Sequence, residues 1–232
     1  MDTQSTSPIT GIPRFYDIIA VAFVGFLLLS NVTATKLIEV PTPFAPLIFD
    51  GGAILFPFTY ILGDVLAEIY GFARARRVIL IGFVMSFVAS FIFLLVQIAP
   101  PAADYHNQAA FEAVLGFVPR IVTASLFAYL AGQLLNSYVL VAIKRRLGEK
   151  NLWVRLIGST LVGEAADTII FCTIAFLGVL TGGAFWNYVV VGYVYKCAVE
   201  VICLPLTYAV IAWMKRHEPA WKPADTLRED NQ

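Results

Sequence analysis

Two pairs of carboxylates lie inside apolar stretches of the sequence. Asp64 and Glu68 belong to the stretch LIFDGGAILFPFTYILGDVLAEIYG, in which Tyr60 precedes Asp64 by four residues. In a helix this spacing places all three side chains on one side. Two acids on one side of a helix in lipid are costly unless they face a wet cavity or a partner. The pattern therefore indicates a binding site, and pairing with Arg74, Arg77 or a neighbouring helix is the alternative.

The second acidic pair lies in the stretch LWVRLIGSTLVGEAADTIIFCTIAF. At about 100° per residue, four side chains project within about 60° of one another. They are Thr160, Glu164, Asp167 and Phe171. This stretch therefore also presents acids on one helix face, and Arg155 near its start either marks the topology or takes part in the site.

A polar stripe runs along a third apolar stretch, PRIVTASLFAYLAGQLLNSYVLVAI. Ser125, Tyr129, Gln133 and Asn136 fall within about 80° of arc on a helix. The stripe predicts either one wall of a polar cavity or hydrogen bonds between helices, which Ser and Asn often form in membranes. Asn31, the least expected polar residue of the first apolar stretch, is assigned to the same cavity.

Lys196 and Glu200 lie one turn apart in the last apolar stretch. Either they form a mutual salt bridge, or Lys196 neutralises an acid of another stretch. We expect four charged residues either to couple transport to an energy source or to stabilise the structure: Lys196, Glu200, Arg77 and Arg155. Because desolvation favours the protonated form of a carboxyl group, the buried acids also permit proton coupling.

Charges are scarce in a chain of this composition. Of 232 residues, 59% are hydrophobic and 14% are charged, and the mean hydropathy is +0.78. An average soluble domain is about 25% charged, so the composition indicates a membrane protein. A spanning helix needs about 20 apolar residues. Six stretches qualify: Tyr16–Leu37, Leu47–Tyr70, Arg77–Ala99, Val118–Ile143, Leu152–Leu180 and Phe185–Met214.

Basic residues gather at alternate connections between these spans. They occur in the second and fourth connections and after the last span, whereas the first, third and fifth connections lack them. The positive-inside rule then places both termini in the cytoplasm. The predicted fold is an all-α, polytopic membrane protein with six transmembrane helices. It has an N-terminal cytoplasmic segment 1–15, a transmembrane domain 16–214 and a polar cytoplasmic tail 215–232.

The sequence also bears on a possible internal repeat and on which other functions the chain could have. Three helices in each half, with acidic pairs in spans two and five, suggest an inverted 3+3 pseudo-repeat. A net charge of zero gives no reason to expect nucleic acid. The three cysteines lack CxxC spacing and the two histidines lie apart, so we predict no metal site and no cofactor. An intramembrane acid/base enzyme remains an alternative, without a recognisable catalytic motif.

The predicted polar residues suit a flat ligand rich in N–H groups. Carboxylates accept hydrogen bonds from adjacent N–H donors, as on guanine, and amide side chains complement a lactam. Tyr60, Tyr129 and Phe171 offer aromatic faces for stacking. A planar heterocycle fits this inventory, as do many other small polar molecules.

Three polar motifs resemble those of a known family. Residues 51–71 read GGxxxFPxTYxxxDxxxExYG and are followed by ARRV. Residues 128–137 read AYxxGQxxNS, and residues 157–168 read IGSTxxGExxDT. In this order and at these separations they resemble the queuosine precursor transporter family, also described as a vitamin uptake transporter family. The resemblance covers nearly the whole membrane core.

The resemblance implies a six-helix importer of the bacterial inner membrane. Its cargo would be 7-deazapurine precursors of queuosine, such as preQ0 and preQ1, and its partners this small molecule and the lipid bilayer. Small residues on several spans permit a homodimer without requiring one. Residue patterns and motifs together predict these binding residues: Asn31, Tyr60, Asp64, Glu68, Tyr129, Gln133, Asn136, Glu164, Asp167 and Phe171.

The energy source and the preferred precursor stay open at this level. The chain has no GxxxxGK[ST] loop of its own. It is therefore a proton-coupled carrier, a facilitator, or the membrane subunit of an energy-coupled importer for this or another vitamin-like heterocycle.

Overall fold

Six helices of the chain are long and apolar enough to cross a membrane. The structure is a computed structural model, and it describes residues 13–43, 45–147, 152–219 and 221. The side chains of residues 144, 146–147 and 152–156 lie outside the description. The prediction of a mostly helical chain with six spans is confirmed. Most of the predicted terminal segments 1–15 and 215–232 falls outside the described residues, and the 3+3 repeat stays a prediction.

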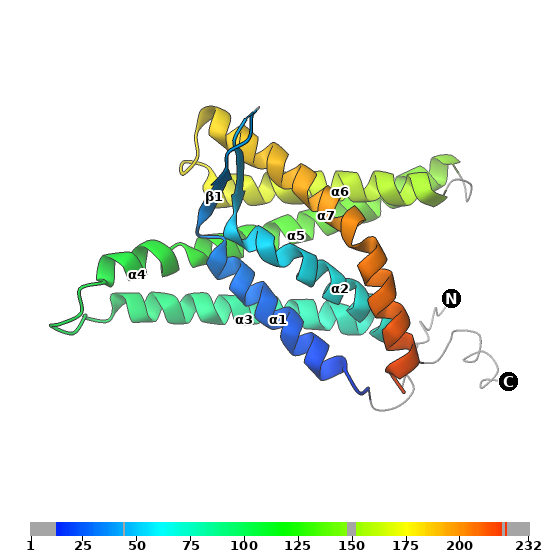
Figure 1. Cartoon of the computed structure of the whole chain (residues 1–232), viewed down its shortest axis with the longest axis horizontal. Helices are drawn as coiled ribbons and strands as arrows, with labels where there is room; N and C mark the ends of the chain where they lie inside the picture. The colour runs from blue at the N-terminus through cyan, green and yellow to red at the C-terminus, as the bar shows by residue number, and fades with distance from the viewer. Residues whose placement is uncertain (1–12, 44, 148–151, 220, 222–232) are drawn as a thin grey trace.

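The spanning helices alternate in direction along the long axis of the molecule (Figure 1). The start of the first helix and the end of the last lie at one end of this axis, which we call the terminal end. Toward the opposite end a β-hairpin stands beside the start of α7, with the α3–α4 connection extending beyond it (Figure 1), and we call this the hairpin end. In chain order the elements are α1 (Tyr16–Thr33), β1 (Leu37–Val40), β2 (Leu47–Asp50), η1 (Gly51–Leu55), α2 (Phe56–Tyr70), α3 (Phe72–Ile98), α4 (Gln108–Leu115), α5 (Val118–Leu147), α6 (Leu152–Phe176) and α7 (Gly182–His217).

A two-stranded hairpin connects α1 to the second span, so the chain is mostly helical rather than all-α as predicted. β1 and β2 pair antiparallel, with Leu37 opposite Asp50. Gly51 follows directly and packs against the end of α1, because a Cβ on it would lie 2.5 Å from the carbonyl oxygen of Thr33. The predicted span Leu47–Tyr70 therefore begins as a strand and a 3₁₀ turn, and only its later part is an α-helix.

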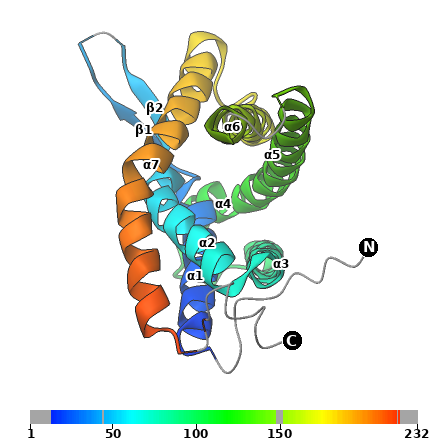
Figure 2. The same ribbon diagram turned by 90° about the vertical axis from the view of Figure 1, so that its right-hand side faces the viewer.

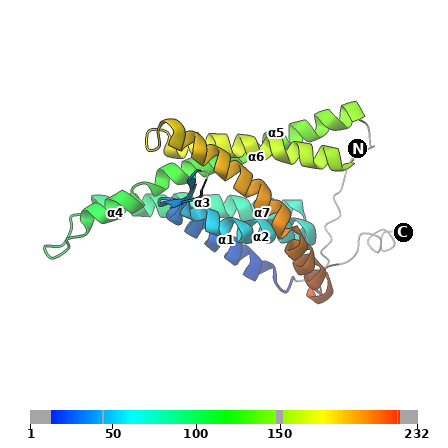
Figure 3. The ribbon, with the colours of Figure 1, turned by 45° about the horizontal axis from the view of Figure 1, so that its top comes forward.

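The helices α5 and α6 form a closely packed antiparallel pair (Figures 1 and 3). A Cβ on Gly163 would lie 2.8 Å from the Cβ of Asn136 and 3.0 Å from the carbonyl oxygen of Gly132. A Cβ on Gly132 would in turn lie 3.0 Å from the Cβ of Asp167. The two glycines thus permit backbone contact between the helices, and they fix where Asn136 and Asp167 lie.

The longest helix, α7, links the two ends of the molecule. Its 36 residues correspond to about 54 Å at about 1.5 Å per residue, more than the roughly 30 Å of hydrocarbon. It contacts β2, α6 and α2 in turn, and Figure 2 shows it along one side of the bundle. Pro205 lies inside α7 and removes one of its backbone hydrogen bonds.

Apolar clusters hold each end of the bundle together. The cluster at the terminal end joins α1, α2, α3 and α7 and includes Phe23, Val65, Leu66, Ile69 and Met214. The cluster at the hairpin end joins β2, α5, α6 and α7 and includes Ile48, Ile121, Cys172, Phe176 and Tyr188. The space between the two clusters is the part of the fold that the polar residues line.

A carboxylate fastens the terminal end. Glu218, which is 3% exposed, accepts hydrogen bonds from the backbone N–H groups of Arg14 and Phe15 and from the hydroxyl of Tyr70. These contacts tie the start of α1 to the ends of α2 and α7.

The close α5–α6 contact leads to a stability prediction. Gly163→Ala should lower the melting temperature of the purified protein in detergent by several degrees, because overpacking costs about 1–3 kcal/mol. Gly25→Ala is the matched control, since a Cβ on Gly25 meets nothing within 4 Å and alanine favours a helix. Equal melting temperatures for the two variants would contradict this packing.

Candidate functional site

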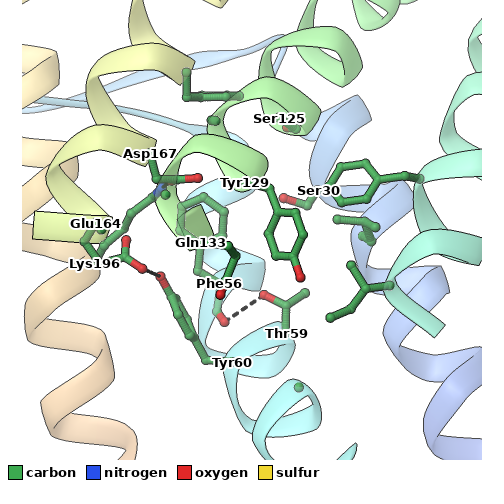
Figure 4. Close-up of a pocket in the computed structure, with 18 of the residues that line it drawn as sticks. Ser30, Phe56, Thr59, Tyr60, Ser125, Tyr129, Gln133, Glu164, Asp167 and Lys196 are labelled. Carbon is green, nitrogen blue, oxygen red and sulfur yellow. Dashed lines mark hydrogen bonds and ion pairs between the residues drawn. The ribbon is translucent and has the colours of Figure 1, made fainter. Parts of the chain in front are cut away.

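A cavity of about 490 Å³ lies between the six spanning helices (Figure 4). Each of the six contributes to its wall. Nine of the ten predicted binding residues line it: Asn31, Tyr60, Asp64, Tyr129, Gln133, Asn136, Glu164, Asp167 and Phe171. Lys196 and Glu200 line it as well. The structure thus brings together side chains from five helices that are far apart in the sequence.

The directions of the helices show which lining residues lie at the same depth in the cavity. α2 and α7 run from the hairpin end to the terminal end, and α6 runs the opposite way (Figure 1). The deep layer, nearest the hairpin end, consists of Phe56, Lys196 and Asp167. The middle layer, about one helical turn or about 5.4 Å away, consists of Tyr60, Glu164 and Glu200.

An ion pair occupies the deep layer. Lys196 donates from its Nζ to Oδ2 of Asp167, and its side chain is 11% exposed. The Nζ atom also lies 5.3 Å from the ring centroid of Phe56, which favours a cation. Of the two interpretations of Lys196, the structure shows the one in which it neutralises an acid of another span.

Acceptor atoms without partners occupy the middle layer and its surroundings. The hydroxyl of Tyr60 donates to Oε1 of Glu164 over 3.2 Å, drawn as a dashed line in Figure 4. Oε2 of Glu164 and Oδ1 of Asn136 are buried and have no hydrogen-bond partner in the described part of the chain. Both residues line the cavity, so a ligand or water there is the natural source of the missing donors.

The cavity is open toward the terminal end. There Asp64, Gln133 and Arg76 line it and are exposed. At the hairpin end its lining includes Asn31 and Asp50, each only 4% exposed. Seen from the terminal end, α5 and α6 stand apart from α2 and α3 (Figure 2). The cavity is therefore accessible from one end and closed at the other.

Hydrogen bonds between the hairpin and α7 close the far end. Asp50 accepts from the hydroxyl of Tyr188 over 2.6 Å and from the backbone N–H of Gly52 over 2.8 Å. Asn187 accepts from and donates to the hairpin backbone over 3.1 and 2.8 Å. Tyr195 donates to the carbonyl of η1 at Ala53 over 2.9 Å.

Asn31 links three helices at the cavity wall. Its Nδ2 donates to Ser86 of α3 over 3.3 Å, and its Oδ1 accepts from Ser125 of α5 over 3.1 Å. For Asn31 and Ser125 the structure therefore shows hydrogen bonding between helices, which was one interpretation of the polar stripe. Gln133 and Asn136, nearer the open end, form no hydrogen bond that joins helices within the described residues.

The remaining predicted residues lie elsewhere. Glu68 is exposed on α2 outside the cavity lining and pairs with Lys215 of α7, with 2.5 Å between Oε1 and Nζ. Arg77 is exposed on α3 and does not line this cavity. The side chain of Arg155 lies outside the described part. Among the described residues no group of His, Cys, Asp and Glu could hold a metal ion.

Comparison with known families gives the class of the protein. The profile of a family described as "Putative vitamin uptake transporter" matches residues 50–210, which include most of the cavity lining. The chain belongs to the putative vitamin uptake transporter family. This is a transporter family and not an enzyme family.

Curated relatives carry a more specific name. A probable queuosine precursor transporter of Bacillus subtilis is 36% identical over 68% of this chain and 69% of the relative. The queuosine precursor transporter of Escherichia coli is 29% identical over 65% of this chain and 66% of the relative. A probable queuosine precursor transporter of Haemophilus influenzae is 30% identical over 54% of this chain and 51% of the relative. No solved structure matches the chain.

Some lining residues of this vitamin uptake transporter were missed by the sequence analysis. Asp50, Phe56 and Arg76 line the cavity, and Tyr188 closes its far end. Phe56 belongs to the motif of residues 51–71, which was the available signal. Arg76 stands in the ARRV sequence that follows this motif but was not assigned to the site, and the contact of Asp50 with Tyr188 joins residues 138 positions apart.

The ion pair of the deep layer leads to a second stability prediction. Lys196→Met should lower stability markedly, because breaking a buried pair costs about 3–5 kcal/mol. Adding Asp167→Asn should restore most of the loss, since no uncompensated charge then remains buried. Thermal unfolding in detergent measures both variants. Losses that simply add in the double variant would show that the two side chains do not act as a pair.

Proposed function

We propose that this vitamin uptake transporter imports queuosine precursors, 7-deazapurines such as preQ0 and preQ1, across the bacterial inner membrane. The observation that carries the proposal is the convergence of nine predicted binding residues on one membrane cavity. The names of the relatives in three bacteria supply the cargo.

The size and chemistry of the cavity support a bicyclic base as cargo. Its volume of about 490 Å³ falls within the roughly 300–1,000 Å³ of small-molecule sites. Glu164 and Asn136 present unpartnered acceptors, which match the N–H edge of a deazaguanine ring. Tyr60, Tyr129 and Phe171 provide flat faces beside them.

We further infer that both termini lie in the cytoplasm, so that the open end of the cavity faces inward. Most described basic residues support this orientation because they lie on segments at the terminal end, whereas outside the cavity only Lys36 and Arg120 of the described residues lie toward the hairpin end. The residues at the terminal end are Arg14, Arg74, Arg76, Arg77, Arg145, Lys215 and Arg216. A bilayer with this protein would thus have the hairpin on its outer side.

Uptake measurements test the binding proposal. In cells that cannot make the precursors, Glu164→Gln should lower uptake of labelled preQ1 about 10-fold or more, because a hydrogen bond to a charged group contributes about 1.5–3 kcal/mol. The accumulated label should be chemically unchanged preQ1 before its use in tRNA.

Glu68→Gln is the matched control for this experiment. It makes the same chemical change on an acid that lies outside the cavity and pairs with Lys215, so uptake should stay near the level of the unchanged protein. Normal uptake by Glu164→Gln at normal expression, or an equal loss in both variants, would overturn the site assignment.

Fusion reporters test the orientation. A fluorescent protein that folds only in the cytoplasm should fluoresce when joined to the C-terminus, whereas a phosphatase active only outside should work when inserted into the hairpin loop near Thr42. The reverse pattern would invert the proposed topology.

A further inference from the structure

The lining of the cavity contains more acid than base. Its described acids are Asp50, Asp64, Glu164, Asp167 and Glu200, and its described bases are Arg76 and Lys196. Lys196 is already engaged by Asp167, and Arg76 lies at the open mouth. Asp50 is satisfied by Tyr188 and Gly52 at the closed end. Asp64 lies at the open mouth together with Arg76. The excess of negative charge therefore falls mainly on Glu164 and Glu200 of the middle layer, and Asp64 adds an unpaired acid at the mouth.

Two of these acids are unpaired in the described part of the chain. Among the described residues neither Asp64 nor Glu200 forms an ion pair or a hydrogen bond. They project from α2 and α7, which pack against each other, and both line the same cavity as Glu164. Like charges that share a low-dielectric site repel one another until a cation or a proton neutralises them.

A second, independent observation indicates that a ligand fills this place. Oε2 of Glu164 and Oδ1 of Asn136 are buried acceptors without donors in the described chain. They lie on α6 and α5, whereas Asp64 and Glu200 lie on α2 and α7. The cavity thus presents buried acceptors for N–H groups on one side and uncompensated carboxylates on the other.

We propose that the cavity selects a 7-deazaguanine carrying an ammonium group, the aminomethyl form preQ1, over the form carrying a nitrile, preQ0. Glu164 and Asn136 receive the N–H edge of the ring, and Glu200 and Asp64 receive the ammonium group. This inference rests on the proposed function and specifies its substrate.

The chemistry of the two substituents separates them sharply. An ammonium group brings a positive charge and three N–H donors, and its hydrogen bonds to carboxylates are of the strong, charge-assisted kind. A nitrile brings no charge and no donor, and its nitrogen lone pair would face carboxylate oxygens. When preQ1 is bound, its ammonium group neutralises the carboxylates of the cavity. When preQ0 is bound, only protonation can neutralise them.

Binding by the full-length protein in detergent tests the preference. At neutral pH the unchanged protein should bind preQ1 about 10-fold or more tightly than preQ0, as expected for charge-assisted hydrogen bonds. preQ1 acetylated on its amine, which loses the positive charge and gains a small acyl group, should bind no better than preQ0. Equal affinity for preQ1 and preQ0 would overturn the inference while leaving the proposed function standing.

Two variants locate the selectivity. Glu200→Gln and Asp64→Asn should each weaken preQ1 several-fold and leave preQ0 nearly unchanged, so that the ratio of affinities falls. Glu68→Gln should keep the ratio. A variant that weakens both ligands by the same factor counts against the assignment, and the acetylated ligand keeps the test decisive if either variant fails to fold. Absence of binding by both rings to the unchanged protein would overturn the proposed function itself.

Discussion

A charge inside a low-dielectric interior must be paired, hydrogen-bonded or left in contact with water. In this chain that constraint acts on a ladder of side chains between α2, α6 and α7. The pair of Lys196 and Asp167 meets it in the deep layer and joins α6 to α7. One turn away Glu164 and Glu200 find no cation in the described chain, so the helices around them must enclose a space that a polar molecule can enter. The cavity is the structural outcome of that unmet requirement.

The angular position of the site residues could be predicted because helix geometry is local. Residues about 100° apart share a face regardless of what the rest of the chain does, and this placed Tyr60, Asp64, Gln133 and Glu164 on the cavity side. Depth was harder to predict. Glu68 lies on the same side of α2 as Asp64 in projection, yet one turn further on, the neighbour is Lys215 of α7 rather than the cavity.

Contacts between distant segments had no local signature. The hairpin consists of two four-residue strands whose partner is α7, and neither period nor composition distinguished it from a loop. The hydrogen bond from Tyr188 to Asp50 and the choice of Asp167 by Lys196 both depend on how α7 crosses the bundle. That crossing follows from tertiary packing, such as the glycine contact of α5 with α6, which a single sequence does not specify.

At the closed end of the cavity, polar groups add individual hydrogen bonds to the apolar cluster that joins β2, α5, α6 and α7. Asp50, Tyr188, Asn187 and Tyr195 hold the hairpin and η1 to α7 through individual hydrogen bonds. Each such bond contributes only about 1 kcal/mol net, because water can replace the lost partner. Any opening of this end has to break these bonds, and the water that enters satisfies the same donors and acceptors. Separating the hairpin from α7 at this end would therefore hydrate these polar groups and also expose apolar side chains of the cluster beside them.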